Sequence, residues 1–254
     1  MTGRLLIQGM VAGLLAGILA FAFATVVGEP QIELAIAYED GMSQIHQHSH
    51  AQTEGEASEA GEMVSREVQS TYGLLTGMLV YSVSLGGIYA LVFAYAIGRT
   101  GVASPRSLAA LLALAAFIVI FLIPGLKYPA NPPATNIAET IDVRTLMFFL
   151  MILVSVVTAI VALSTTRRLI PSLGSWNATF LGLSLYIAVM ATTAFMLPST
   201  NEIPDDFPAV VLWKFRTASI GIHLVLWASM GLIFGLLVEK LPSGRSHFSR
   251  AKIV

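Results

Sequence analysis

The run LLIQGMVAGLLAGILAFAFATVV, residues 5–27, decides the fold class. It holds no charged residue, and about 20 apolar residues in a helix cross roughly 30 Å of hydrocarbon. Similar runs recur along the chain, so the sequence predicts an all-α polytopic membrane protein with about six transmembrane helices. The six expected spans are Leu5–Val27, Tyr72–Ile97, Leu108–Ile123 with room to extend toward Leu126, Leu146–Thr165, Trp176–Leu197 and Thr217–Val238.

The overall composition supports the same class. Hydrophobic residues make up 56% of the 254 residues and charged residues only 11%, whereas soluble domains are about a quarter charged. We therefore expect residues 1–254 to form a single integral membrane domain in contact with the lipid bilayer, with no nucleic-acid partner. The absence of cysteine excludes disulfides and thiolate metal sites.

The charged residues divide unevenly between the two sides of the predicted bundle. One side receives nine Lys and Arg residues and one acid, and it includes the short basic tail at 239–254; the other receives five cations and fourteen acids. Cytoplasmic loops retain positive charge, so both termini are predicted to be cytoplasmic. The first run has a second interpretation as a cleaved signal peptide, because Arg4 precedes it and Ala22-Phe-Ala24 resembles a cleavage site.

Glycines are spaced along three of the expected spans in a way that favours close helix packing. Small residues four positions apart let helix backbones approach where lipid supplies no hydrophobic drive for association. These glycines are Gly9, Gly13 and Gly17 in the first span, Gly73 and Gly77 in the second, and Gly231 and Gly235 in the last.

Residues 28–70 form an acidic segment between the first two spans, predicted to be extracytoplasmic. The segment holds nine Asp and Glu residues, three histidines and a single cation, Arg66. If Pro30 opens a short helix, Glu29, Glu33 and Asp40 share one face at about 100° per residue. That face suits the collection of cations, and the alternative is an ordinary solvated helix face.

The histidines of this segment, His46, His48 and His50, stand at alternate positions. Imidazole suits cobalt, nickel, zinc and copper, and an extended or flexible backbone with this spacing can wrap three nitrogens around one ion. An idle polar tract or a pH sensor is the alternative. The small and acidic residues that follow, 52–62, lack the apolar content to fold alone and predict a flexible arm.

One ionisable residue, His223, falls inside the expected spans, near the outer end of the last one. Intramembrane ionisable groups are costly and are functional candidates by default, so a transport or proton role competes with a simple hydrogen bond to a Ser or Thr of a neighbouring helix. The predicted metal ligands are therefore His46, His48, His50, Glu29, Glu33, Asp40 and His223.

Two proline-rich loops are candidates to complete a vestibule around these residues. Residues 124–133 supply Lys127 and Asn131, and residues 201–208 supply Glu202, Asp205 and Asp206. The ordinary interpretation of both is a proline-stiffened connection between helices.

The sequence lacks the common catalytic and nucleotide-binding motifs, which argues against an enzyme. The sequence contains no nucleotide-binding Gly-x-x-x-x-Gly-Lys-Ser/Thr loop, no His-Glu-x-x-His and no Gly-x-Ser-x-Gly. One membrane histidine without paired acids offers no evident acid–base constellation. We expect no catalytic residue and no cofactor bound for catalysis, and any energy must come from ion gradients, the membrane potential or another subunit.

Five stretches together make the chain resemble the CbtA family of predicted cobalt transporter subunits. They are the glycine-rich first span, Gly28-Glu-Pro-Gln-Ile-Glu33, His46-x-His48-x-His50, Ile123-Pro-Gly-Leu-Lys-Tyr-Pro-Ala-Asn-Pro-Pro133, and the last span with Trp213-Lys-Phe-Arg-Thr-Ala-Ser-Ile220 and Leu226-Trp-Ala-Ser-Met-Gly231. The family is described with about five spans, and it has a Trp-rich stretch where this chain has Arg144-Thr-Leu-Met-Phe-Phe149.

The resemblance implies a multi-pass protein of the bacterial cytoplasmic (inner) membrane that imports cobalt for cobalamin synthesis, with Co²⁺ as its substrate. It also implies a small single-span partner with a histidine-rich end. The residues alone do not separate Co²⁺ from Ni²⁺ or Zn²⁺, since all three accept nitrogen and oxygen ligands. A metal or pH sensor, an assembly subunit without transport activity, and a homo-oligomer remain open.

Overall fold

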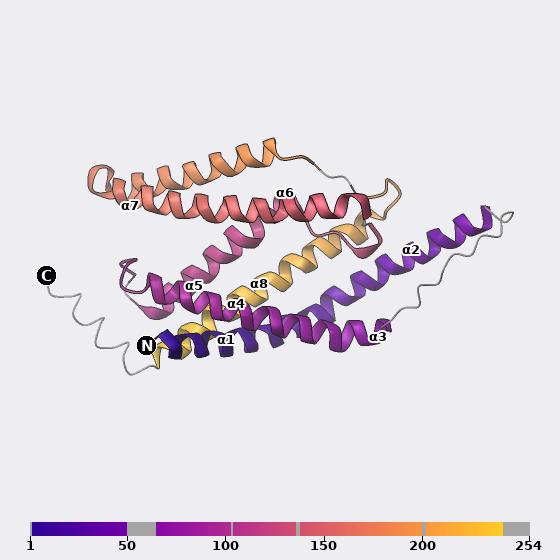
Figure 1. The fold of residues 1–254 in the computed structure, drawn as a ribbon, viewed down its shortest axis with the longest axis horizontal. Helices are drawn as coiled ribbons and strands as arrows, with labels where there is room; N and C mark the ends of the chain where they lie inside the picture. The colour runs from indigo at the N-terminus through magenta and orange to yellow at the C-terminus, as the bar shows by residue number, and fades with distance from the viewer. Residues whose placement is uncertain (1, 50–64, 103, 136–137, 200–201, 241–254) are drawn as a thin grey trace. The chain divides into compact units, whose positions relative to one another are not determined.

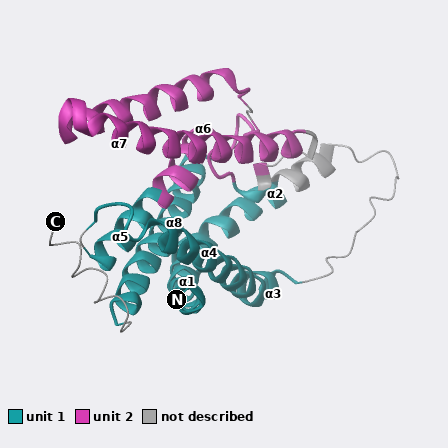
Figure 2. Cartoon of the chain, turned by 60° about the vertical axis from the view of Figure 1, so that its left-hand side comes forward, with its two compact units in different colours: residues 1–115, 132–134, 208–254 teal, residues 116–131, 135–207 magenta. Residues whose placement is uncertain are grey.

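The computed structural model describes residues 2–49, 65–102, 104–135, 138–199 and 202–240. These residues form helices and turns, and no strand occurs among them (Figure 1). The predicted all-α class is confirmed. The helices group into two compact units, residues 1–115, 132–134 and 208–254 in unit 1 and residues 116–131 and 135–207 in unit 2 (Figure 2). The expectation of one membrane domain stays a prediction.

Unit 1 begins with one long helical rod made of α1 (Thr2–Phe23), the π-helical η1 (Ala24–Gly28) and α2 (Glu29–Ser49). Pro30 is the second residue after η1, and a proline inside a helix removes a hydrogen bond and crowds the carbonyl four residues earlier. A π-helical turn is one of the usual ways in which a helix absorbs such a disturbance. The predicted helix after the first span is therefore present, but it continues α1 instead of starting at Pro30.

A second rod runs through α3 (Arg66–Val68), the π-helical η2 (Gln69–Gly73) and α4 (Leu74–Ala96). Unit 1 also contains α8 (Ala209–Glu239) and nearly all of α5 (Pro105–Ala116). The helix α1 packs along both α4 and α8, so it is an integral part of this unit.

The glycines of α1 meet α4 as predicted. A Cβ atom added at Gly9 or Gly13 would overlap with backbone atoms of Gly86 or Ser82, and one at Gly17 would overlap with the Ser82 side chain. In α8, a Cβ at Gly231 would likewise overlap with Ala113 of α5, and Gly235 lies against Arg106 and Ala109. The second span does not follow the prediction: an added Cβ at Gly77 has no described atom within 4 Å, and one at Gly73 would meet only Val68 of its own rod.

Unit 2 contains the π-helical η3 (Phe117–Leu122), α6 (Ile123–Lys127) and α7 (Ala138–Met196), and the short 3-10 turn η4 (Pro133–Thr135) precedes α7. Gly174 divides α7, because its φ of 75° and ψ of 164° are not helical. The two halves lie side by side: a Cβ at Gly182 would overlap with Thr166, and Ser155 and Tyr186 share a 2.7 Å hydrogen bond. The Ser155 hydroxyl donates to the Val119 carbonyl of η3 at 2.6 Å.

Five helices of the described chain are long and apolar enough to cross a membrane, which is close to the predicted six. They are Thr2–Gly41, Arg66–Ala96, Pro105–Lys127, Thr140–Met196 and Ala209–Glu239. The difference arises at Gly174. The helical hydrogen bonding continues across this residue, so Thr140–Met196 counts as one helix of 57 residues, although the chain reverses its direction there. The third helix extends to Lys127, as the sequence allowed, and the last begins eight residues before the predicted Thr217.

Candidate functional site

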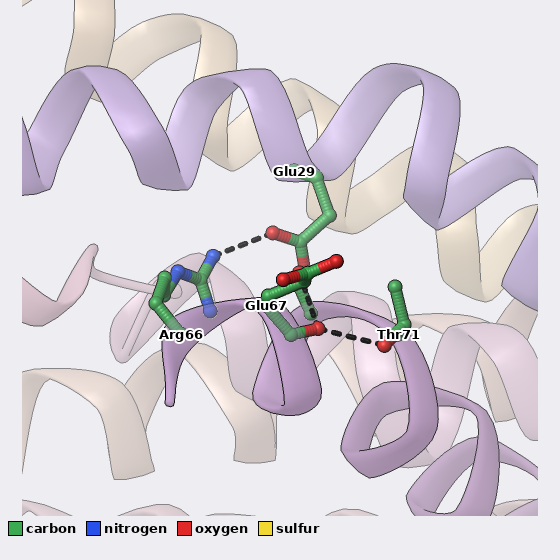
Figure 3. A network of polar contacts seen from close by, with 5 residues as sticks. Glu29, Arg66, Glu67 and Thr71 are labelled. Atoms are coloured by element: carbon green, nitrogen blue, oxygen red, sulfur yellow. Dashed lines mark hydrogen bonds and ion pairs between the residues drawn. The ribbon is translucent and has the colours of Figure 1, made fainter. Parts of the chain in front are cut away.

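An ion pair joins the two ends of the acidic segment. Glu29 opens α2, and Arg66 opens α3. The Arg66 guanidinium donates from Nη2 to Oε2 of Glu29 at 2.5 Å (Figure 3). The only cation of residues 28–70 therefore neutralises the acid at the start of the segment, and the pair brings together residues 37 positions apart.

Two π-helical turns flank this pair, η1 immediately before Glu29 and η2 three residues after Arg66. Such turns are uncommon in helices and are frequent at functional sites. The hydroxyls of Ser70 and Thr71 in η2 donate to the Glu67 carbonyl of α3 at 3.2 and 2.7 Å (Figure 3). Both rods thus depart from regular α-helix next to the ion pair.

Arg66 occupies an electrostatically unfavourable place in its own helix. The amino-terminal end of a helix carries partial positive charge, so an arginine in the first turn is repelled, whereas Glu67 beside it is stabilised. No side chain caps α3 at Ser65. The attraction of Glu29 is consequently the main described interaction that holds the Arg66 guanidinium in place.

The three acids predicted to share a face of α2 differ in their surroundings. Glu29 is 9% exposed and paired, while Glu33 and Asp40 are exposed. The face is therefore divided into a buried, neutralised carboxylate at the start of α2 and solvated acids farther along the helix. Among the described residues, no group of three or more His, Asp or Glu side chains is arranged to hold a metal ion.

The histidine tract is described only in part. The backbone of α2 is helical through Ser49, which differs from the extended or flexible backbone expected for His46 and His48. Their side chains, His50 and the predicted flexible arm at 52–62 lie outside the described part of the structure. The tract as a metal site stays a prediction.

His223 lies at the middle of α8, not near its end. The helix begins at Ala209, so His223 stands about 21 Å from that end at roughly 1.5 Å per residue. Hydropathy placed the start at Thr217 because Lys214 and Arg216 interrupt the apolar run, but both belong to the helix. Nδ1 of His223 lies 3.0 Å from the Ser219 carbonyl, one turn earlier in the same helix.

Helix α8 packs against the rod that carries Glu29. A Cβ atom added at Gly28 would lie 3.3 Å from Cδ1 of Ile222. The sequence neighbours of these two residues are Glu29 and His223, so both predicted ligands adjoin one contact between η1 and α8.

Unit 2 contains a second charged centre, which the sequence analysis did not identify. The Glu202 side chain is fully buried; it accepts hydrogen bonds from Nη1 of Arg144 at 2.9 Å and from Oγ1 of Thr140 at 2.7 Å. Nη2 of Arg144 also donates to the Pro129 carbonyl. The centre therefore fastens the first turns of α7 to both proline-rich loops of this unit.

The predicted grouping of acids in the 201–208 loop is corrected by this burial. Glu202 is sealed inside unit 2, whereas Asp205 and Asp206 are exposed, so the three do not act as one acidic set. A nearby signal was available in the sequence: Arg144 directly precedes a long apolar run, and a cation at such a place needs a partner.

Tyr128 adds a further connection within unit 2. Its hydroxyl donates to the Pro198 carbonyl at 2.8 Å, and the residue is buried. Burial raises the pKa of the Tyr128 phenol above its ordinary value of 10.0, so the group remains a hydrogen-bond donor at neutral pH. The 124–133 loop is thus bonded to Pro198 through a phenol and to Glu202 of the other loop through Arg144.

Comparison with known proteins gives a family for the chain. No curated protein and no solved structure matches it. A family model described as "Probable cobalt transporter subunit (CbtA)" matches residues 2–239, which include every helix described above. The chain therefore belongs to the CbtA family of cobalt transporter subunits.

Proposed function

We propose that this protein imports cobalt across the bacterial cytoplasmic membrane, with the acidic segment at 28–70 collecting Co²⁺ on the outer side. The membership of the chain in a cobalt transporter family and its five apolar helices support a role in membrane transport. The observation that carries the collecting role is the pairing of Arg66 with Glu29. It uses the only cation of the segment and leaves eight acids and three histidines without a positive residue among them.

The asymmetry of charge supports the proposed direction. Nine cations on the side of the termini favour a cytoplasmic location of that side. The acidic segment then faces outward, where its negative potential raises the local concentration of divalent cations. A link to cobalamin synthesis follows from the resemblance stated above and belongs to the same proposal.

We place the entry to the membrane near Glu29 and His223. The contact between Gly28 and Ile222 supports this placement, because each residue directly adjoins one of the two candidate ligands. A carboxylate and an imidazole are both ligands of divalent transition metals. His46, His48, His50, Glu33 and Asp40 would deliver the ion to this entry from the acidic segment.

A second role is favoured by the family description, which names a subunit. In that case the chain binds the metal outside but needs a partner, such as a small single-span protein, before the ion crosses. A sensor without transport activity would behave in the same way when expressed alone. Co²⁺ is the expected ion in each version, with Ni²⁺ and Zn²⁺ as the competitors.

The test is metal accumulation in a host that lacks its own cobalt and nickel importers. Cells expressing the wild-type chain should accumulate cobalt above nickel and zinc, as measured by mass spectrometry. The triple replacement of His46, His48 and His50 by Ala should raise the cobalt concentration that gives half-maximal uptake. His247→Ala, outside the acidic segment, is the matched control and should have no effect.

The outcomes separate the two roles. No accumulation by a chain shown to be folded in the membrane, together with binding of Co²⁺ to membrane vesicles, would replace self-sufficient transport by a binding or assembly role. Equal uptake by the wild type and the histidine variant would contradict the collecting role of the tract. A lower maximal rate in His223→Ala, with unchanged half-saturation, is the expected sign of a residue on the route.

A further inference from the structure

Arg66 is a partly buried arginine whose hydrogen-bonding capacity is only partly used among the described residues. Only its Nη2 atom contacts Glu29, and its Nε atom is buried without a hydrogen-bond partner among the described residues. A paired arginine is held most firmly when two of its nitrogens donate in parallel to one carboxylate. A buried donor without a partner costs free energy in addition. The contact thus neutralises the Glu29 carboxylate but leaves the buried Nε–H donor of the guanidinium without a hydrogen bond among the described residues.

The placement of Arg66 also favours its release. Its helix end repels a cation, and the side chain is 37% exposed while that of Glu29 is 11% exposed. The guanidinium therefore has a path to solvent, whereas the carboxylate does not leave the rod. The segment is acidic by sequence, with nine Asp and Glu residues and Arg66 as its only cation, so its charge favours keeping a released guanidinium nearby.

Glu29 cannot be left alone once it is buried. An uncompensated buried carboxylate is strongly destabilising, so some cation must be present whenever the rods are packed. A divalent cation at the same distance attracts a carboxylate about twice as strongly as a guanidinium charge does. A divalent metal ion can also coordinate further ligands while it is bound to the carboxylate. A guanidinium cannot, because it only donates hydrogen bonds.

We propose that Arg66 is a tethered counter-cation that occupies Glu29 until a divalent metal ion displaces it. This inference rests on the proposed function, because it regulates the carboxylate at which we place the entry. In the absence of metal the pair neutralises Glu29 and holds Glu29 and Arg66, at the two ends of the acidic segment, together. Metal binding at Glu29 frees Arg66 and lets these two ends separate, so entry requires a cation with enough charge to displace the guanidinium.

The first test measures Co²⁺ binding to the purified full-length chain by isothermal titration calorimetry. Replacing His46, His48 and His50 by Ala in every sample removes the competing imidazoles. In this background Arg66→Gln should lower the Kd for Co²⁺ about tenfold, the equivalent of about 1.4 kcal/mol, because no resident cation has to leave. Adding Glu29→Gln should abolish the gain, and Arg66→Lys should resemble the parent.

A matched control is provided by Arg106, which pairs with Glu239 in the same unit. Arg106→Gln removes an arginine from an ion pair that we do not place on the metal route, so the Kd for Co²⁺ should not change. Equal or weaker binding by a folded Arg66→Gln variant would overturn the proposal and make Arg66 a structural clasp. An equal gain in Arg106→Gln would overturn it too, because the effect would then be one of net charge.

A second test needs no substitution and decides the matter if Arg66→Gln does not fold. Arginines of the wild-type protein are labelled with an arginine-selective dicarbonyl and read by peptide mass spectrometry. Co²⁺ should raise the labelling rate of Arg66 several-fold and leave Arg144 unchanged. An unchanged rate at Arg66 with Co²⁺ bound would contradict displacement.

These results are separable from the fate of the proposed function. A wild type that accumulates cobalt, with no change of affinity in Arg66→Gln, would overturn only the counter-cation role. Tighter binding in Arg66→Gln together with no accumulation by the wild type would support a displaceable site and overturn transport by the chain alone.

Discussion

Two ion pairs of the described chain, one partly exposed and one buried, use the same kinds of residue in opposite ways. In Glu29–Arg66 the arginine donates to Glu29 through one nitrogen, has a buried Nε without a partner among the described residues, and is 37% exposed. In Glu202–Arg144 the arginine is 16% exposed, bonds a carboxylate and a carbonyl with different nitrogens, and faces an acid with no exposed side-chain surface. Thr140 also donates to Glu202.

This difference shows that an arginine–glutamate ion pair can be either displaceable or fixed, depending on how many further hydrogen bonds surround it. A buried pair contributes to stability only when further hydrogen bonds satisfy its remaining donors and acceptors. Glu202–Arg144 meets that condition by joining α7 to two loops of unit 2, and we interpret it as a fixed fastening. Glu29–Arg66 does not meet it, and it lies at the start of the most acidic segment of the chain.

The largest effect is expected from breaking the fixed pair. Arg144→Ala should lower the free energy of unfolding by about 3–5 kcal/mol, because it leaves the Glu202 carboxylate buried and unpaired. Thermal unfolding in detergent measures the loss. The double variant Arg144→Met with Glu202→Leu should recover most of it, since no charge is then buried. A loss below about 1 kcal/mol in Arg144→Ala would contradict the fastening role.

A smaller effect is expected from breaking the displaceable pair. Arg66→Gln should cost about 1–2 kcal/mol, because the Arg66 side chain is 37% exposed and donates to Glu29 through one nitrogen. Co²⁺ should raise the unfolding temperature of this variant more than that of the wild type, since at one ligand concentration the ligand with the lower Kd stabilises the folded state more. The same measurement with Arg144→Ala should show no such extra gain.

Tyr128→Phe should cost about 1 kcal/mol at pH 7 through the lost hydrogen bond to the Pro198 carbonyl. The folded-state pKa of Tyr128 is raised above 10.0, so its contribution is complete below that pH and declines as the pH rises through the folded value. Unfolding measured at pH 7 and above pH 10 should therefore show a smaller alkaline loss in the variant. An identical pH dependence would place the phenol in solvent.

The smallest effect is expected at the exposed pair of Arg106 and Glu239. Their side chains are 54% and 43% exposed, and surface pairs contribute about 0–1 kcal/mol. Arg106→Gln should leave the unfolding temperature nearly unchanged at moderate salt. A loss as large as that of Arg66→Gln would mean that exposure does not separate the pairs.

Much of the fold was predictable because apolar runs of spanning length signal helices in lipid. The helix class, five of the runs and the packing of Gly9, Gly13 and Gly17 follow from local sequence alone. The start of α8 was mispredicted, because Lys214 and Arg216 interrupt the hydropathy but not the helix. The reversal at Gly174 makes two predicted runs part of one long helical element.

The charged centres were less predictable, since their partners are distant in sequence. Glu29 was expected to share a face with Glu33, but its partner lies 37 residues away. Glu202 and Arg144 are 58 residues apart, and only the reversal of α7 and the path of the proline-rich loops bring them together. Residue type predicted which groups bear charge, and only the tertiary structure determines how each is neutralised.

Hydrogen–deuterium exchange with and without Co²⁺ tests the central contrast between the two pairs most directly. Peptides from residues 66–73 should exchange faster once Co²⁺ displaces Arg66, while peptides from 140–146 and 202–207 should not change. Na⁺ at the same ionic strength serves as the control, because a monovalent cation lacks the charge by which a divalent ion displaces the guanidinium. Unchanged exchange at 66–73 with Co²⁺ bound, or an equal change at both centres, would contradict the division into a displaceable and a fixed ion pair.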